Sequence, residues 1–169
     1  MAAVAVYPGT FDPFTYGHID LVKRSLRLFP RLIVAVANNP HKTPLFTLEE
    51  RLAIVREATA GMPGVEVDTF SDLTVEYVRR KGANVILRGV RAVSDFEFEF
   101  AMALMNRKMN EEIETLFLMP NEAYTYISSR LVKEVALLGG AVDDLVPPLA
   151  AKLLKARASQ TPAGGRRTP

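Results

Sequence analysis

Five short runs of apolar and β-branched residues recur along this chain, and segments with the apolar spacing of amphipathic helices separate them. The runs lie at residues 3–6, 31–38, 65–70, 85–87 and 115–119. Strands that alternate with helices pair in parallel through right-handed crossovers, which place helices on both faces of the sheet. The alternation therefore predicts an α/β fold with a five-stranded, mainly parallel sheet. Ligands of such sheets bind beyond the carboxyl ends of the strands, where the strand order reverses.

Capping residues mark where two of the predicted helices begin. Thr47 and Glu50 form one capping-box pattern, and Ser94 and Glu97 form a second. The helix after the second box carries large apolar side chains on one face, at Phe96, Phe100, Leu104 and Met105. The predicted helices cover residues 17–29, 47–59, 73–81, 95–110, 128–138 and 147–158.

Length and composition favour one Rossmann-like domain, at residues 1–158, followed by a polar tail at 159–169 that we expect to be disordered. The chain has no cysteine, which excludes disulfides, thiolate metal sites and thiol nucleophiles. The net charge is only +2, and Arg166 and Arg167 of the tail account for it, so a nucleic-acid surface is not expected. No apolar run approaches the roughly 20 residues of a membrane span, and no secretory signal is recognisable. We therefore expect a cytoplasmic protein.

The first strand, its loop and the next helix form a candidate phosphate site. Pro8 and Gly9 are expected to end the strand, and the helix begins at Gly17 and His18. Free backbone N–H groups and the positive end of the helix dipole bind anions at such a turn. Thr10 adds a hydroxyl, His18 adds an imidazole, and the missing Cβ of Gly17 lets a ligand approach the backbone.

Cationic and polar side chains follow the later strands at the same predicted edge. Lys42 comes after the second strand, Arg88 and Arg91 come after the fourth, and residues 124–130 come after the fifth. Guanidinium groups bind phosphate oxygens in a bidentate manner, so the two arginines strengthen the prediction of a phosphate ligand. His41 lies in a polar loop and is expected to have no chemical role.

Four sequence blocks carry a resemblance to a known family. The segment Thr15-Tyr16-Gly17-His18 resembles the T-x-G-H signature of the nucleotidylyltransferase superfamily. YPGTFDP with GHIDLV, the RGxRxxxDFExE-like block at residues 88–99 and the ISSSxVKE-like block at 127–134 resemble pantetheine-phosphate adenylyltransferases more specifically. This resemblance implies reversible transfer of the adenylyl group of ATP to 4′-phosphopantetheine, which gives dephospho-coenzyme A and pyrophosphate. Coenzyme A biosynthesis contains this step.

The resemblance also assigns roles to residues. It implies catalytic roles for Thr10, His18, Lys42 and Arg91. It implies that Thr10, Lys42, Thr74 and Arg88 bind phosphopantetheine. The implied ATP site comprises Thr10, Phe11, His18, Gly89, Val90, Arg91, Glu99, Tyr124, Thr125, Tyr126, Ile127, Ser128, Ser129 and Arg130. Two positions depart from the family pattern, because Phe98 replaces a common tyrosine and Arg130 replaces the third serine of the last block.

The implied nucleophile is a phosphate monoester, which is largely ionised at neutral pH because its second pKa is near ~6, so no general base is expected. We expect in-line attack without a covalent intermediate, and Mg²⁺ carried mainly by the ATP phosphates rather than by a dedicated protein site. The resemblance further implies a homohexamer and possible feedback by coenzyme A. Two alternatives stay open: a T-x-G-H nucleotidylyltransferase with another phosphate acceptor, such as nicotinate mononucleotide or glycerol phosphate, and a non-catalytic nucleotide-binding protein.

Overall fold

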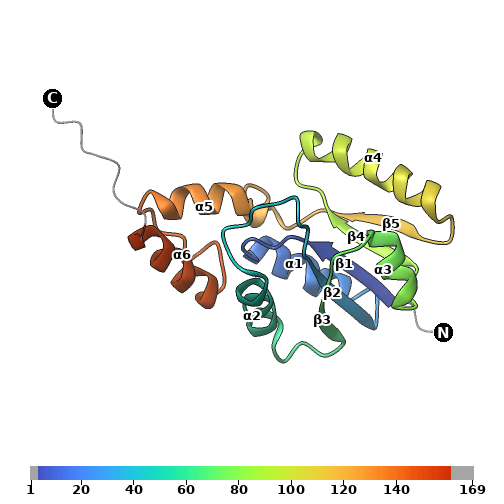
Figure 1. The fold of residues 1–169 in the computed structure, drawn as a ribbon, viewed down its shortest axis with the longest axis horizontal. Helices are drawn as coiled ribbons and strands as arrows, with labels where there is room; N and C mark the ends of the chain where they lie inside the picture. Colours follow the sequence, from blue (N-terminus) through green and yellow to red (C-terminus); the bar gives the residue numbers. More distant parts are fainter. Residues whose placement is uncertain (1–3, 161–169) are drawn as a thin grey trace.

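The computed structural model describes residues 4–160, apart from the side chains of residues 93 and 94. Strands and helices alternate along the chain as predicted (Figure 1). In chain order they are β1 (Val4–Gly9), α1 (Tyr16–Ser25), β2 (Arg31–Ala37), α2 (Leu48–Thr59), β3 (Val65–Phe70), α3 (Thr74–Arg80), β4 (Val85–Gly89), α4 (Val93–Met109), β5 (Glu114–Leu118), the short 3₁₀ helix η1 (Glu122–Tyr124), α5 (Ser129–Leu137) and α6 (Pro148–Gln160).

The five strands form one sheet in the order β3-β2-β1-β4-β5, and every neighbouring pair is parallel. The direction of winding reverses between β1 and β4. The carboxyl ends of these two strands therefore form the crevice where ligands of open α/β sheets bind. The predicted fold class is confirmed.

Alternating side chains of the strands face two separate apolar cores. On one face, Tyr7 and Val34 pack with α1, α2, α5 and α6. On the other face, Val6 and Ile33 pack with α3. Helices α5 and α6 lie together at one end of the molecule, and α4 lies at the other end beside β5 (Figure 1). Among residues 4–160 no helix is long and apolar enough to span a bilayer.

The prediction that β1 ends at Pro8 is wrong, because the strand continues to Gly9. Pro8 and Gly9 pair with Ala35 and Val36 of β2, whereas pairing with β4 ends at Val6. The Pro8 carbonyl faces β4 and accepts a hydrogen bond from Nη1 of Arg88 at 2.8 Å. Since the nitrogen and carbonyl of one strand residue point to the same side, the missing N–H of Pro8 falls where no ladder partner is needed.

Helices α1 and α4 each differ from the predicted boundary at one end. Helix α1 ends at Ser25, although Phe29 remains buried after the turn that follows. Helix α4 begins at Val93 with Ala92 as its N-cap, so the predicted capping box at Ser94 and Glu97 is wrong. The box at Thr47 and Glu50 is confirmed in both of its hydrogen bonds.

Helix α4 turns polar side chains inward and leaves large apolar side chains exposed. Its side chains buried inward are the polar Glu99 and Asn106. The apolar side chains predicted to share one face are instead exposed by 44–56%: Phe96, Phe100, Leu104 and Met105. Polar side chains can face inward here because the inner side of α4 borders a cavity rather than packed side chains.

Helix α6 extends through Ser159 and Gln160, two residues past the predicted domain end. The rest of the predicted tail, residues 161–169, lies outside the described residues.

Candidate active site

The turn between β1 and α1 holds His18 through a capping box. Thr15 is the N-cap of α1, and its backbone N–H donates to Nδ1 of His18 at 2.9 Å. Because Nδ1 accepts this bond, the neutral imidazole carries its proton on Nε2. The ring stacks on Phe14 and meets Phe11 edge-on, with both pairs of ring centroids 5.2 Å apart. Packing and capping together fix a hydrogen-bond donor at the predicted phosphate site.

His18 is uncharged at neutral pH. Burial, followed by the charges of Arg91 and Arg88, lowers its pKa from 6.5 to about 3. A neutral Nε2–H can donate a hydrogen bond to a phosphoryl oxygen but is a poor general acid at pH 7. Such a donor can stabilise negative charge on a bound phosphate.

Phe11 turns the chain between β1 and α1 and has an unusual backbone conformation. Its φ of 50° lies in the left-handed region, which is uncommon for residues other than glycine. A Cβ on Gly9 would lie 2.7 Å from the Phe11 ring, so the glycine is needed for this close packing. The next peptide bond, between Asp12 and Pro13, is cis.

Lys42 lies in the loop between β2 and α2, beside the end of β1. Its Nζ is 3.3 Å from Oγ1 of Thr10. The structure thus brings together a lysine and a hydroxyl that are far apart in sequence, as the strand-end argument predicted.

Arg88 and Arg91 are held by carboxylates of α4. Arg88 binds both carboxylate oxygens of Glu99, at 2.7 and 2.5 Å. Burial alone would lower the pKa of Arg88, but the bonds and charge of Glu99 raise it above its usual value. Arg91 binds Asp95 at 3.1 and 3.3 Å, and its Nη1 donates to the carbonyl of Ile127 at 2.9 Å. Both guanidinium groups are thereby fixed before any ligand binds.

Helix α5 brings a second N-terminus to the site. Ser128 is its N-cap and accepts from the N–H of Leu131 at 3.1 Å. The hydroxyl of Ser129 donates to the Pro13 carbonyl at 2.8 Å, which joins α5 to the β1–α1 turn. Arg130 points to solvent, with its side chain 89% exposed, and pairs with Glu134 at 3.1 Å.

Two cavities meet at these residues. The larger, of about 700 Å³, lies between the β1–α1 turn, the two arginines and α5. The smaller, of about 520 Å³, lies beneath α4 and reaches Phe70, Thr74 and Asn106. Both volumes suit small-molecule ligands. Their shared walls include Thr10, Lys42 and Arg88. A group bound in one cavity can therefore reach a group bound in the other at this junction.

Most of the predicted site residues line the larger cavity. They are Thr10, Phe11, His18, Lys42, Arg88, Gly89, Arg91, Glu99, Tyr124, Ile127, Ser128, Ser129 and Arg130. Thr74 lines the smaller cavity. Val90, Thr125 and Tyr126 line neither one.

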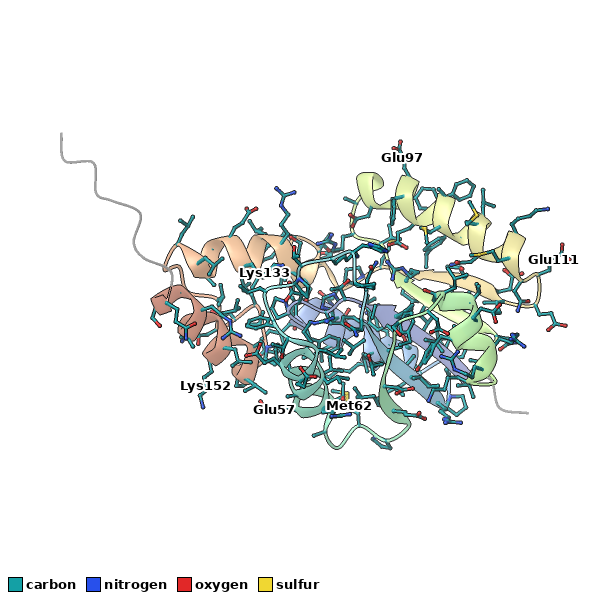
Figure 2. All side chains as sticks on the ribbon, viewed as in Figure 1. Glu57, Met62, Glu97, Glu111, Lys133 and Lys152 are labelled. Carbon is teal, nitrogen blue, oxygen red and sulfur yellow. The ribbon has the colours of Figure 1, made fainter. Side chains whose placement is uncertain are left out.

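Sequence reasoning missed several residues of the site. His41 lines both cavities, although it was expected to have no role. Asp12 and Lys133 line the larger cavity, and Nζ of Lys133 binds Oδ2 of Asp12 at 2.5 Å. Lys133 lies on the inner side of α5, whereas Glu97 projects outward from α4 (Figure 2). The position of Lys133 four residues after Ser129, on the same helical face, was the signal that could have identified it.

Within residues 4–160, no three His, Asp or Glu side chains lie close enough together to hold a metal ion. The carboxylates that line the larger cavity, Asp12, Asp95 and Glu99, each bind a cationic side chain. Because these carboxylates are already paired, a divalent cation at this site would take its oxygen ligands from a bound polyphosphate and from water.

Comparison with known proteins identifies the class. Residues 6–135 match the family model described as cytidylyltransferase-like. The fold resembles the structure of a Vibrio parahaemolyticus protein assigned as a nicotinate-nucleotide adenylyltransferase, with a TM-score of 0.69, 16% sequence identity and 94% of each chain covered. Fold and site thus define a nucleotidyltransferase of the cytidylyltransferase-like family.

Curated relatives identify the family of this chain within that class of proteins. The phosphopantetheine adenylyltransferase of Alkalilimnicola ehrlichii is 63% identical over 94% of this chain and 92% of its own. That of Geotalea daltonii is 53% identical over 91% of this chain and 96% of its own. The chain belongs to the phosphopantetheine adenylyltransferase family, as the resemblance implied. The relatives do not favour either alternative function.

Proposed function

We propose that the chain transfers the adenylyl group of ATP to 4′-phosphopantetheine and releases dephospho-coenzyme A and pyrophosphate. The observation that carries the proposal is the junction of the two cavities at Thr10, Lys42 and Arg88. The larger cavity has the helix N-termini and arginines that suit a triphosphate. The smaller one extends under α4 and suits an elongated acceptor.

The proposed reaction is a single in-line displacement at the α-phosphorus. A phosphate oxygen of phosphopantetheine attacks, the bond from phosphorus to the bridging oxygen breaks, and pyrophosphate leaves with the electron pair. The attacking phosphate has its second pKa near ~6, so it is already ionised and needs no general base. Positioning and charge neutralisation supply the catalysis.

Residue roles follow from position. Nε2–H of His18 donates to the α-phosphate as charge develops, and Lys42 neutralises charge between the two phosphates. Thr10 orients the nucleophile, and Arg88 binds the phosphate of phosphopantetheine. Arg91 binds the ATP phosphates.

The remaining assignments are part of the same proposal. Thr74 contacts the pantetheine arm. The other ATP-binding residues are Phe11, Gly89, Val90, Glu99, Tyr124, Thr125, Tyr126, Ile127, Ser128, Ser129 and Arg130. Mg²⁺ bound to the ATP phosphates supplies charge neutralisation on the leaving pyrophosphate.

We further propose a cytoplasmic homohexamer that coenzyme A inhibits by occupying the two cavities. Support for an assembly comes from the outward face of α4, where Phe100 and Met105 are exposed by 48% and 56%. Exposed apolar patches of this kind mark protein contacts. Light scattering measures the assembly, and inhibition kinetics against phosphopantetheine measure the feedback.

The decisive experiment couples two readouts. Pyrophosphate release from Mg-ATP is measured with and without 4′-phosphopantetheine, alongside formation of dephospho-coenzyme A. We expect release that depends on phosphopantetheine and matches the product one for one. With α-thio-ATP, inversion of configuration at phosphorus supports a single displacement, whereas retention would refute it. Release without phosphopantetheine, or with a different acceptor only, would refute the assigned acceptor.

A further inference from the structure

Two buried charged residues outside the assigned roles hold the loop that carries Lys42. We propose that Arg51 and Asp12 are positioning residues, which act by fixing the loop at residues 38–47 so that Lys42 faces the end of β1. The inference rests on the proposed function, because Lys42 is assigned there to the reacting phosphates.

The loop itself has little packing. Residues 38–43 are all exposed to solvent, and α2 begins only at Leu48. The loop has local turn bonds, since Asn39 accepts from the N–H groups of His41 and Lys42 at 2.8 and 3.1 Å. These bonds shape the turn but do not attach it to the sheet. The loop is attached where it leaves β2, since the N–H of Asn38 donates to the carbonyl of Phe70 at 2.8 Å, and its remaining position must be set where it approaches α2.

Arg51 attaches both ends of the loop to the backbone that directly follows β1. It projects from α2, and its side chain is only 2% exposed. Nη1 donates to the carbonyls of Thr10 and Ala37, each at 2.8 Å, and Nε donates to the carbonyl of Phe46 at 3.3 Å. Ala37 is the last residue of β2, and Phe46 lies near the end of the loop. One guanidinium thus joins the start of the loop, its end and the backbone of Thr10.

Asp12 holds the end of the loop through two backbone N–H groups. Its Oδ1 accepts from the N–H of Phe46, and its Oδ2 accepts from the N–H of Leu45, both at 3.0 Å. Phe46 is therefore held by both of its backbone polar groups, since its N–H donates to Asp12 and its carbonyl accepts from Arg51. Oδ2 also accepts from Lys133, so the same carboxylate links the loop to α5.

The burial of these charges supports a positional role. An unpaired buried charge is costly, and apolar packing of similar volume often stabilises a fold as well as a buried ion does. What an apolar pair cannot do is fix three carbonyls and two N–H groups in defined directions. Because Lys42 sits between the fixed ends, small movements of those ends displace its ammonium from the phosphates. A displacement of about 1 Å at a reacting group can lower the rate by about 100-fold.

The test is a double-mutant cycle with Arg51→Lys and Lys42→Met, assayed by dephospho-coenzyme A formation. Lysine keeps the charge at residue 51 but cannot reach three carbonyls in the same geometry. We expect Arg51→Lys to lower kcat by about 10- to 100-fold when Lys42 is present and by less than about 3-fold in the Lys42→Met background. An equal reduction in both backgrounds would overturn the proposal.

Amide hydrogen exchange provides a second readout that needs no activity. We expect faster exchange at Leu45 and Phe46 in Arg51→Lys and in Asp12→Asn, with α6 unchanged. Unchanged exchange at these two amides in both variants would contradict the anchoring role. If Arg51→Lys does not fold, Asp12→Asn in the same cycle with Lys42→Met decides the question.

Tyr77→Phe is the matched control. Tyr77 is also buried, and its hydroxyl donates to Asp68 at 2.9 Å, on the other face of the sheet. The Tyr77→Phe substitution should lower thermal stability without coupling to Lys42. Its effect on kcat should therefore be the same in the wild-type and the Lys42→Met background. Absence of dephospho-coenzyme A from the wild-type protein would refute the proposed function instead, and the exchange measurement would still test the anchoring.

Discussion

Replacing His18 with three different side chains separates its capping role from its chemical role. Nδ1 of His18 accepts the Thr15 N–H at 2.9 Å, which leaves Nε2–H as the donor toward phosphate. Glutamine can reproduce both functions, because its carbonyl oxygen can accept the capping bond while its amide nitrogen donates. Glutamate can form the capping box but has no donor when ionised. Alanine removes both functions.

The expected sizes follow from these contacts. Loss of one donor that stabilises a transition state costs about 2.7–4 kcal/mol, or about 10²–10³ in kcat. We therefore expect kcat to fall by about 10²–10³ in His18→Ala and at least as much in His18→Glu, where a carboxylate also repels phosphate. We expect His18→Gln to remain within about 10-fold of wild type. His18→Ala should also lose about 1 kcal/mol of stability, because it leaves the Thr15 N–H without its partner, whereas His18→Gln keeps that bond.

The assay is steady-state formation of dephospho-coenzyme A at saturating ATP, with thermal unfolding of each variant in parallel. The pH profile adds a second criterion. Since the pKa of His18 is about 3, the acid limb of kcat/KM near pH 6 should reflect the phosphate of the acceptor and remain in His18→Gln. If His18→Gln were as inactive as His18→Ala while folding normally, a neutral donor could not explain the role of His18.

Three further predictions use other features of the chain. The pKa of His18 is lowered from 6.5 to about 3 in the folded state, so unfolding takes up a proton between these pH values. The free energy of unfolding of wild type should therefore fall relative to that of His18→Gln as the pH drops from about 6.5 toward 3. Urea titration at several pH values measures this difference. Arg130→Ser should raise the KM for ATP no more than a few-fold without changing kcat, because the guanidinium is exposed and screened, and 0.5 M salt should abolish the difference between the two enzymes. Phe100→Glu places a charge on the outward face of α4 and should shift the mass seen in light scattering toward smaller species, while an unchanged mass would exclude this face from the assembly.

Local signals predicted most of the secondary structure, and their failures have identifiable causes. The capping box at Thr47 depends on residues within one turn, so it could be read from sequence alone. Pro8 was misread because its place in β1 depends on where pairing with β4 stops, which is a tertiary property. The orientation of α4 was also beyond local reasoning, because a helix that borders a ligand cavity can turn polar side chains inward.

The candidate site was predictable to the extent that the topology was. Once the strands were predicted to be parallel, Thr10, Lys42 and Arg88 had to meet at one edge of the sheet. The partners of these residues were not predictable in the same way. Asp12 and Arg51 act through backbone atoms of distant segments, and no spacing along the chain encodes such contacts.

The electrostatics of the site connect these observations to the kind of chemistry it can perform. Arg88 and Arg91 are each held by a carboxylate, so they are oriented before the substrate arrives and need little reorganisation during the reaction. The charges of the same two arginines, added to burial, keep His18 neutral. In the proposed reaction, the guanidinium groups that bind phosphate therefore also keep the histidine unprotonated, so that it acts neither as a general acid nor as a strong base. A neutral histidine is compatible with adenylyl transfer to a phosphate, since the nucleophile is already ionised and the leaving pyrophosphate needs charge neutralisation more than a proton.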